Sequence, residues 1–398
     1  MIGLCVLCVL CGERFYKMKK VISANQAVSQ AVRAARAQVI AAYPITPQST
    51  IVEMLASFCA QGDLRAKFIN VESEHSAMAA CIAAASVGAR TFTATSSQGL
   101  ALMHEMLHYA SGLRFPIVMA NVNRAMGSPF NLKADLSDSL SQRDTGWLQF
   151  YCESGQEVFD TIIQSFKISE QVLLPVMVNL EGFILSHTYE IVDIPEQEQI
   201  DAFLPPPAER PILDVEDPAM MGATTDLYIN FRYKMHQAME EAKAVCQKVD
   251  GEYRAAFGRG YDPVQTHRCA GADIILVTAG TIAGTSRAVA DRLSARGLKV
   301  GVLKIKLFRP FPQEQLRRAL ADAKKIAVID RDFSPGCGGI LAQELKSALL
   351  GSRPDIPVHE FIAGLGGRDV TDDHIGWIVE QAMKAREPGG IEWIGLLE

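Results

Sequence analysis

Residues 38–53 read QVIAAYPITPQSTIVE and place a strand, a rigid loop and a helix in succession. The apolar run at 38–42 is typical of a buried strand. Pro44 and Pro47 fix the backbone of the loop that follows, and helical periodicity resumes near Thr50. A loop at the end of a parallel strand lies at the sheet edge where α/β proteins bind their ligands. This stretch therefore predicts both the fold and the position of a site.

The same alternation of short β-rich runs and helical patterns continues through two regions of the chain, which is typical of parallel α/β sheets. In the first region we expect strands at 38–42, 67–71, 91–95, 117–122 and 174–180, and helices at 25–35, 50–59, 76–87, 98–111 and 157–169. In the second region we expect strands at 273–279, 299–306 and 325–330, and helices at 281–295, 312–323 and 340–350. The predicted fold class is α/β, with a doubly wound parallel sheet followed by a second α/β domain.

The sequence between these two regions has a different composition. Residues 195–211 are rich in proline and acidic residues and predict a linker or extended arm, and a charged, mostly helical segment follows at 226–257. The expected organisation is an N-terminal extension at 1–19, a first domain at 20–194, a connection at 195–265 and a second domain at 266–398.

Composition excludes several classes of function. The 398 residues carry 39 Lys and Arg against 45 Asp and Glu, a net charge of −6, and contain no basic block of the kind that nucleic acid binding requires. No apolar run reaches the ~18 residues that span a bilayer, so no membrane association is expected. Cys59, Cys81 and Cys246 stand singly in apolar surroundings, which favours a reducing cytoplasm.

The N-terminal sequence MIGLCVLCVLCG at 1–12 contains Cys5, Cys8 and Cys11 in a C-x2-C-x2-C pattern. An iron–sulfur cluster of the bacterial ferredoxin type would need a fourth cysteine followed by proline, and none follows in register. A signal peptide would need a charged start and an A-x-A-like cleavage site. We expect residues 1–17 to be a disordered or artefactual extension that precedes the natural start at Met18.

An H-E-x-x-H pattern at His104, Glu105 and His108 is typical of zinc hydrolases, because it places two imidazoles one helical turn apart beside a general base. The longer metzincin form needs a glycine and a third histidine at fixed offsets, and Gly112 and Arg114 do not provide them. The surrounding helix is apolar nearly all round, which favours a buried or interface helix. A zinc hydrolase remains the weaker alternative.

Three loops that follow predicted strands carry Thr46, Glu74 and Arg124. Each has an ordinary structural explanation, since Thr46 can cap a helix, Glu74 can complement a helix dipole, and Arg124 can form a surface ion pair. Arg124 is also the only fixed positive charge in its loop, NVNRAMGSP at 121–129, and is the best available anion clamp. Together the loops predict one site for a small anionic substrate.

These loops resemble the alpha subunits of the pyruvate:ferredoxin oxidoreductases, within the 2-oxoacid:ferredoxin oxidoreductase family. The resemblance extends from about Ser23 to the C-terminus. Its most specific blocks are AAYPITPQSTIVE (41–53), ESEHSAM (72–78), FTATSSQGLALMHEMLH (92–108), NVNRAMGSP (121–129), SQRDTGWLQFYCES (141–154), LFRPFP (307–312) and AGLGGRDVT (363–371). The H-E-x-x-H pattern lies inside one of these blocks, so the resemblance explains it without zinc.

The resemblance implies a thiamine diphosphate (ThDP) pyrimidine-binding domain followed by a domain like the transketolase C-terminal domain. A beta subunit would bind the diphosphate with Mg²⁺ and carry a proximal [4Fe–4S] cluster, and gamma and delta subunits would complete the complex. The implied reaction is the reversible oxidative decarboxylation of pyruvate with coenzyme A (CoA), giving acetyl-CoA and CO2, with ferredoxin as electron acceptor. A non-catalytic scaffold that only docks these partners is a further alternative.

The resemblance also assigns roles to individual residues. Glu74 matches the catalytic glutamate that hydrogen-bonds the aminopyrimidine ring and favours its imino tautomer. The cofactor-binding loop beside it contains Tyr43, Pro44 and Ile45.

Thr46 and Arg124 match the pair that binds the substrate carboxylate. A neutral Thr46 favours a monoanion such as pyruvate, whereas oxalate would require a second cation there. Residues 130–138, FNLKADLSD, depart from the usual pyruvate pattern, and Lys133 and Leu136 could alter the fit of the substrate. Other 2-oxoacids, including 2-oxoisovalerate, 2-oxobutyrate and oxalate, therefore stay open.

Overall fold

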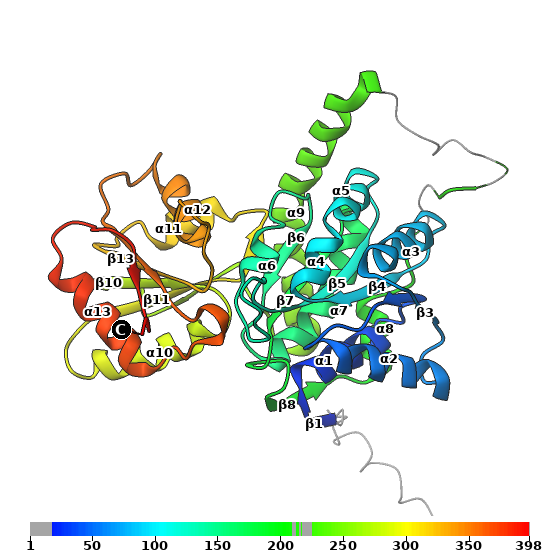
Figure 1. The fold of residues 1–398 in the computed structure, drawn as a ribbon, viewed down its shortest axis with the longest axis horizontal. Helices are drawn as coiled ribbons and strands as arrows, with labels where there is room; N and C mark the ends of the chain where they lie inside the picture. Colours follow the sequence, from blue (N-terminus) through cyan, green and yellow to red (C-terminus); the bar gives the residue numbers. More distant parts are fainter. Residues whose placement is uncertain (1–17, 209–211, 215, 217–224, 398) are drawn as a thin grey trace, which may run out of the picture.

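The structure is a computed structural model that describes residues 18–208, 212–214, 216 and 225–397. The C-x2-C-x2-C pattern lies outside these residues. Two α/β units lie side by side, and a two-stranded ribbon flanks the first of them (Figure 1). The ribbon consists of β1 (Met18–Ser23) and antiparallel β8 (Tyr189–Ile194).

The first unit is built on a seven-stranded sheet of order β12-β6-β7-β5-β4-β2-β3. Its strands are β2 (Val39–Ala42), β3 (Lys67–Asn70), β4 (Thr91–Thr95), β5 (Ile117–Asn123), β6 (Leu148–Tyr151), β7 (Val176–Glu181) and β12 (Leu307–Arg309). All pair in parallel except β12, which comes from the later part of the chain and pairs antiparallel with β6. The second half of the chain therefore completes the first sheet.

Helices cover both faces of this sheet, as its continuous apolar strands require. On one face a core joins the strands to α1 (Ala24–Ala34), α2 (Ser49–Gln61), α7 (Gly155–Val172), α8 (Gln197–Phe203) and α9 (Tyr228–Phe257). On the other face a second core joins them to α3 (Glu74–Ser86), α4 (Ser97–Leu102) and α5 (His104–Gly112). A short helix, α6 (Ser137–Leu140), lies in the long loop after β5.

The second unit has a six-stranded sheet of order β15-β14-β13-β10-β11-β9, in which β9 alone runs antiparallel to its neighbour. Its strands are β9 (Val264–His267), β10 (Ile274–Thr278), β11 (Val300–Ile305), β13 (Ile326–Asp330), β14 (Val358–Ile362) and β15 (Glu392–Trp393). Its helices are α10 (Ile282–Ser294), α11 (Gln313–Ala319), α12 (Ile340–Leu349) and α13 (Asp372–Lys384). The predicted α/β class is confirmed for both units.

Two expectations about local structure were wrong. The single helix predicted at 98–111 is interrupted at Met103, which separates α4 from α5. The linker predicted at 195–211 contains α8, which begins at a capping box formed by Glu196 and Gln199. The ring of Phe203, at the end of α8, packs against Tyr253 of α9 with 5.1 Å between ring centroids.

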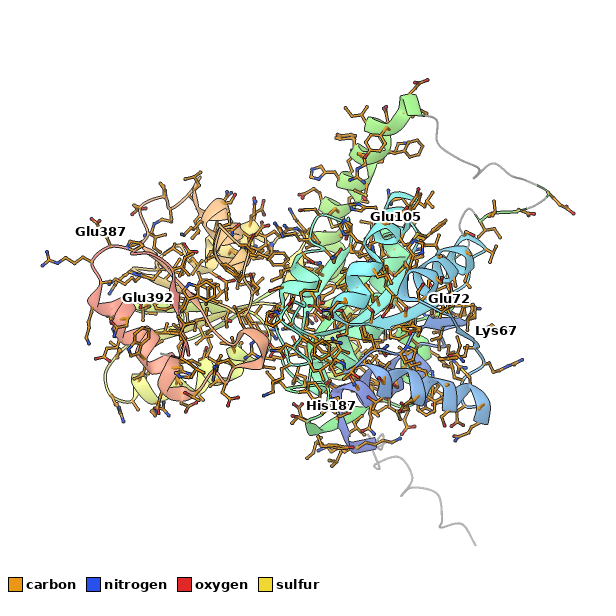
Figure 2. All side chains as sticks on the ribbon, in the orientation of Figure 1. Lys67, Glu72, Glu105, His187, Glu387 and Glu392 are labelled. Atoms are coloured by element: carbon orange, nitrogen blue, oxygen red, sulfur yellow. The ribbon has the colours of Figure 1, made fainter. Side chains whose placement is uncertain are left out.

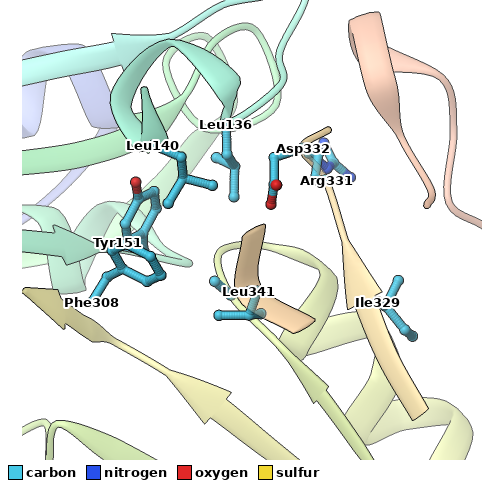
Figure 3. Close-up of a pocket in the computed structure, with 9 residues that line it drawn as sticks. Leu136, Leu140, Tyr151, Phe308, Ile329, Arg331, Asp332 and Leu341 are labelled. Atoms are coloured by element: carbon cyan, nitrogen blue, oxygen red, sulfur yellow. The ribbon is translucent and has the colours of Figure 1, made fainter. Parts of the chain in front are cut away.

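Leu136, Leu140 and Tyr151 of the first unit belong to the same buried core as Phe308 of β12 and Leu341 of α12, which lies in the second unit. Figure 3 shows these side chains around a small cavity between the units, with the Asp332 carboxylate directed into it. The long loop after β5 therefore packs against the second unit.

A buried ionic contact joins the two units further along the first sheet. Lys304 Nζ of β11 lies 2.6 Å from Glu157 Oε2 of α7, and Lys306 Nζ lies 3.8 Å from Glu157 Oε1. Burial alone would raise the pKa of Glu157, but the two ammonium groups outweigh it and hold that pKa below its usual range. No helix within the described residues is long and apolar enough to cross a membrane.

Candidate active site

The candidate site lies at the carboxyl edge of the first sheet. Strands β5, β4, β2 and β3 are neighbours in that order, so the segments that follow them lie next to one another. The structure brings Arg124 and Thr46 together, because Arg124 Nη1 donates a 2.8 Å hydrogen bond to the Thr46 carbonyl oxygen. The main chain of Thr46, rather than its hydroxyl, makes this contact. The Thr46 side chain itself is exposed.

Arg124 is buried and tied at several points. Its Nε donates to the main-chain oxygen of Asn131 at 3.1 Å, and its guanidinium carbon lies 5.3 Å from the centre of the exposed Phe130 ring. Burial lowers the pKa of Arg124, and Asp138 opposes that change. The third guanidinium nitrogen, Nη2, makes no hydrogen bond within the described part of the chain, so it is available to an anionic ligand.

Asp138 organises the ends of β4 and β5. Its Oδ2 accepts hydrogen bonds from the backbone N–H of Ser97 at 3.0 Å and of Arg124 at 3.2 Å. Its Oδ1 accepts from Asn123 Nδ2 at 2.8 Å. Burial raises the pKa of Asp138 to about 6, although these donors favour the charged form. Sequence analysis assigned no role to Asp138, whose one sequence signal is its place in D-x-S-D at 135–138.

Glu74 is the first residue of α3, and only 6% of its surface is exposed. Its carboxylate forms no hydrogen bond or ion pair with any residue that the structure describes. Gly99 provides the space for it, because a Cβ at position 99 would overlap Glu74 Oε1 and lie 2.7 Å from Thr95 Oγ1. The hydroxyls of Thr95 and Ser96 are buried and also lack partners in the described chain.

Tyr43, Pro44 and Ile45 form the loop between β2 and α2, as the sequence predicts. Tyr43 is 38% exposed, and its carbonyl accepts a 2.8 Å hydrogen bond from Gln48 Nε2. The end of the loop is fixed by Asn25 Nδ2, which donates to the Pro47 carbonyl at 2.8 Å. Within the described residues, no hydrogen bond joins this loop to Glu74.

The residues that depart from the usual pyruvate pattern face the second unit. Leu136 is buried in the core between the units, and its N–H donates to the Arg331 carbonyl at 2.8 Å. Lys133 is exposed, and its Cβ packs against Gly367. Leu136 therefore contacts the second unit and supports the loop that carries Arg124 from the face opposite the candidate site.

The structure gives no support to a zinc site at the H-E-x-x-H pattern. His104 Nδ1 is bonded to Gln142 Oε1 at 2.6 Å, and the rings of His104 and His108 meet edge to face. The Glu105 side chain is 70% exposed and lies on the outer surface (Figure 2). The described residues contain no group of three or more possible His, Cys, Asp or Glu ligands.

Comparison with protein families identifies the chain. The family described as pyruvate flavodoxin/ferredoxin oxidoreductase, thiamine diphosphate-binding, matches residues 30–251, and the pyruvate:ferredoxin oxidoreductase core domain II matches residues 272–375. The chain belongs to the ThDP-dependent 2-oxoacid:ferredoxin oxidoreductases. The family predicted from the sequence is confirmed, and the chain is an oxidoreductase subunit homologue.

Two relatives illustrate the range of this family. The chain is 49% identical over 383 residues to "Pyruvate synthase subunit PorA" of Methanothermobacter thermautotrophicus, an alignment that covers 95% of this chain and 98% of the relative. It is also 49% identical over 389 residues to "Ketoisovalerate oxidoreductase subunit VorA" of Pyrococcus horikoshii, with the same two coverages of 95% and 98%.

Solved structures show the fold. A 2-oxoglutarate:ferredoxin oxidoreductase from Magnetococcus marinus matches with a TM-score of 0.72 and 20% identity, covering 92% of this chain and 66% of that one. A split-gene transketolase matches with a TM-score of 0.57 and 14% identity, covering 92% and 99%. The predicted ThDP and transketolase-like folds are confirmed.

The residues at the sheet edge fit the pyrimidine half of ThDP. An aminopyrimidine presents ring nitrogens and an amino group, and Glu74 is a buried carboxylate with no other partner in the described chain. A buried polar group without a partner is costly unless a ligand satisfies it. Gly99 allows the carboxylate to take this position, because any side chain there would overlap it.

Proposed function

We propose that this chain is the alpha subunit of a cytoplasmic complex that oxidatively decarboxylates a monocarboxylic 2-oxoacid, with pyruvate as the first candidate. CoA would accept the acyl group, giving acetyl-CoA and CO2 from pyruvate, and ferredoxin would accept the electrons. The main support is the sheet edge itself: buried Arg124 is bonded to Thr46 and keeps Nη2 without a hydrogen bond in the described residues, and buried Glu74, which has no partner in those residues, lies at the same edge.

ThDP, when bound, supplies the nucleophilic carbon that attacks the 2-oxoacid carbonyl. Glu74 would accept a hydrogen bond from the pyrimidine ring and set where the proton on that ring resides. Tyr43, Pro44 and Ile45 would form the rim of the loop beside the ring. Glu74 is buried at the start of α3, and its low exposure to water strengthens such a hydrogen bond.

Arg124 would bind the substrate carboxylate through Nη2 with a charge-assisted hydrogen bond, and the exposed hydroxyl of Thr46 would add a neutral one. One cation and one hydroxyl match a single carboxylate. A second carboxylate, as in oxalate or 2-oxoglutarate, would find no second charge at Thr46. The relatives named for pyruvate and for ketoisovalerate are both 49% identical to this chain. A panel of 2-oxoacids should therefore be tested as substrates.

The partner subunits complete the proposal. A beta subunit would bind the diphosphate, Mg²⁺ and a [4Fe–4S] cluster, and gamma and delta subunits would pass electrons to ferredoxin. Two observations support this division: both relatives are named as subunits, and the alignment covers 98% of each. The cysteines of the described residues are free thiols, which suits a reducing compartment.

The test is to produce the chain together with the subunits encoded beside it and to follow reduction of a viologen dye. We expect reduction that requires ThDP, CoA and pyruvate. A higher kcat/KM for 2-oxoisovalerate or 2-oxobutyrate than for pyruvate would change the substrate but keep the reaction. Reduction with none of the 2-oxoacids, in a complex that binds ThDP, would overturn the proposal.

A further inference from the structure

The substrate arginine is linked to the second unit through Asn131. The main-chain oxygen of Asn131 accepts the hydrogen bond from Arg124 Nε at 3.1 Å. The Asn131 side chain donates from Nδ2 to the Gly366 carbonyl at 3.1 Å, and its Oδ1 accepts from the Lys133 N–H at 2.7 Å. One residue thus contacts both the guanidinium group and the second unit.

The contact on the second unit is the turn at 364–367, which follows β14 at the carboxyl edge of the second sheet. Gly364, Gly366 and Gly367 all have positive φ, at 83°, 56° and 73°. The N–H of Gly367 donates to the Ala134 carbonyl at 2.7 Å. A Cβ on Gly366 would overlap Asn131 Nδ2. The turn therefore lies directly on the segment that holds Arg124, and only a residue without a side chain fits there.

This arrangement limits where the guanidinium group can lie. The Asn131 side chain is bonded to the turn, and its main-chain oxygen is one of two hydrogen-bond acceptors of Arg124. The Thr46 carbonyl is the other. A displacement of about 1 Å in a group that positions a substrate can cost about 10²-fold in rate. A side chain at position 366 would push Asn131 and hence the acceptor of Arg124 Nε.

We propose that Asn131 and the turn at 364–367 are positioning elements for Arg124, so that the second unit sets the affinity for the 2-oxoacid carboxylate. This inference rests on the proposed function, because it requires Arg124 to bind substrate. Neither Asn131 nor Gly366 touches the reacting atoms. Their effect is expected on KM for the 2-oxoacid, with little change in kcat or in the affinity for ThDP.

The first experiment measures Gly366→Ala in the assembled complex. We expect KM for the 2-oxoacid to rise about tenfold, with kcat and the dissociation constant of ThDP within about twofold of wild type. The matched control is Gly297→Ala, since Gly297 also has positive φ, +91°, but no neighbouring atom within 4 Å of its Cβ position. The control also places an alanine at positive φ but without the contact, so its KM should not change.

A double-mutant cycle tests the link itself. Asn131→Ala removes the side chain that an alanine at position 366 would overlap. In this background the factor by which Gly366→Ala raises KM should therefore be at least about fivefold smaller than in wild type. Additive effects would overturn the proposal. If Gly366→Ala does not assemble, Asn131→Asp replaces it: that side chain keeps its shape but presents an acceptor to the Gly366 carbonyl, and KM should rise while kcat is retained.

Arg124→Ala distinguishes a failure of the proposed substrate site from a failure of the proposed positioning by the second unit. If it leaves KM unchanged, Arg124 does not bind the substrate and both the proposed site and this inference fail. If it raises KM while Gly366→Ala behaves like Gly297→Ala, the site stands and the positioning by the second unit is wrong.

Discussion

Glu74 and Arg124 lie on the same sheet edge and are equally buried, with 6% and 5% of their surface exposed, yet their surroundings are opposite. Glu74 has no partner in the described chain, and its carboxylate occupies the space that the missing side chain of Gly99 leaves. Arg124 is held by the carbonyls of Thr46 and Asn131. In the proposed site, the group without a partner would meet the cofactor, and the group that is fixed would meet the substrate.

This difference predicts different kinetic consequences. A change at Glu74 should affect the chemical step, since nothing else in the described chain replaces its carboxylate. A change at Arg124 or its supports should affect substrate binding more than turnover, since a carboxylate contact exists already in the ground state.

The largest effect is expected for Glu74→Gln, which preserves shape but removes the charge. Turnover should fall by about 10²–10⁴-fold, the usual contribution of a positioned acid–base group. Steady-state dye reduction by the purified complex measures it. Glu72→Gln is the matched control, because Glu72 is two residues away but exposed and bonded to Ser76. Equal turnover in the Glu74 variant and its control would remove Glu74 from the chemistry.

Gly99→Ala should be the next most damaging change, because its methyl group would occupy the space of the Glu74 carboxylate. We expect both kcat and the affinity for ThDP to fall about 10–100-fold, since a misplaced group loses much of its effect. Calorimetric titration of ThDP measures the second quantity. Gly112→Ala, on the neighbouring helix with no atom within 4 Å of its Cβ position, should leave both values near wild type. A wild-type affinity in Gly99→Ala would show that the space is not needed.

Arg124→Lys tests whether Arg124 needs its two carbonyl contacts in order to bind the substrate. Lysine keeps the charge but cannot reach the Thr46 and Asn131 carbonyls and the substrate together, because it lacks the planar fork of arginine. KM for the 2-oxoacid should rise about tenfold and kcat should change less, whereas Arg124→Ala should raise KM further. A kcat that falls while KM stays constant would indicate that Arg124 acts on the transition state alone.

The smallest effect expected is on pH dependence. The pKa of Asp138 is raised to about 6 by burial, so its carboxylate becomes protonated as the pH falls through that value. A protonated oxygen no longer accepts from both Ser97 and Arg124 N–H groups, so KM should rise a few-fold below pH 6. The free energy of unfolding changes in the opposite direction. Because the pKa of Asp138 is higher in the folded chain than in the unfolded chain, where it is about 4, this group stabilises the fold below about pH 4. That stabilisation is lost as the pH rises through about 6.

Asp138→Asn should remove this pH dependence and leave KM high at every pH. The amide replaces one acceptor oxygen with an NH2 group, which cannot accept the hydrogen bonds that this oxygen receives in wild type. The control is Asp332→Asn. Burial also raises the pKa of Asp332 to about 6, but its bond is to the Ile340 N–H at 2.7 Å in the second unit. If the Asp332 variant rather than the Asp138 variant loses the pH dependence, the titrating group lies between the units.

Much of the fold followed from periodicity. The strands expected in the first region lie within two residues of β2, β3, β4, β5 and β7, and the strand at 91–95 coincides with β4. The four residues of β6 and the three of β12 gave no usable pattern, because each strand is defined by pairing rather than by its own sequence. The break at Met103 was missed because apolar residues continue through it.

The site was predicted as far as the position of each residue relative to its strand. Thr46, Glu74 and Arg124 were found because each follows a strand, and the structure joins Thr46 to Arg124. The sequence could not indicate that a main-chain oxygen makes this contact. Asn131 and Gly366 were also hidden, because they lie 235 positions apart and only the packing of the two units brings them together.

The role of Glu74 is tested most directly by hydrogen–deuterium exchange at the reactive thiazolium carbon of ThDP bound to the complex, without any 2-oxoacid. This measurement does not depend on which substrate the enzyme uses. With ThDP bound in both proteins, exchange in Glu74→Gln should be at least about 100-fold slower than in wild type. Equal exchange rates would contradict the assignment of Glu74 to the cofactor.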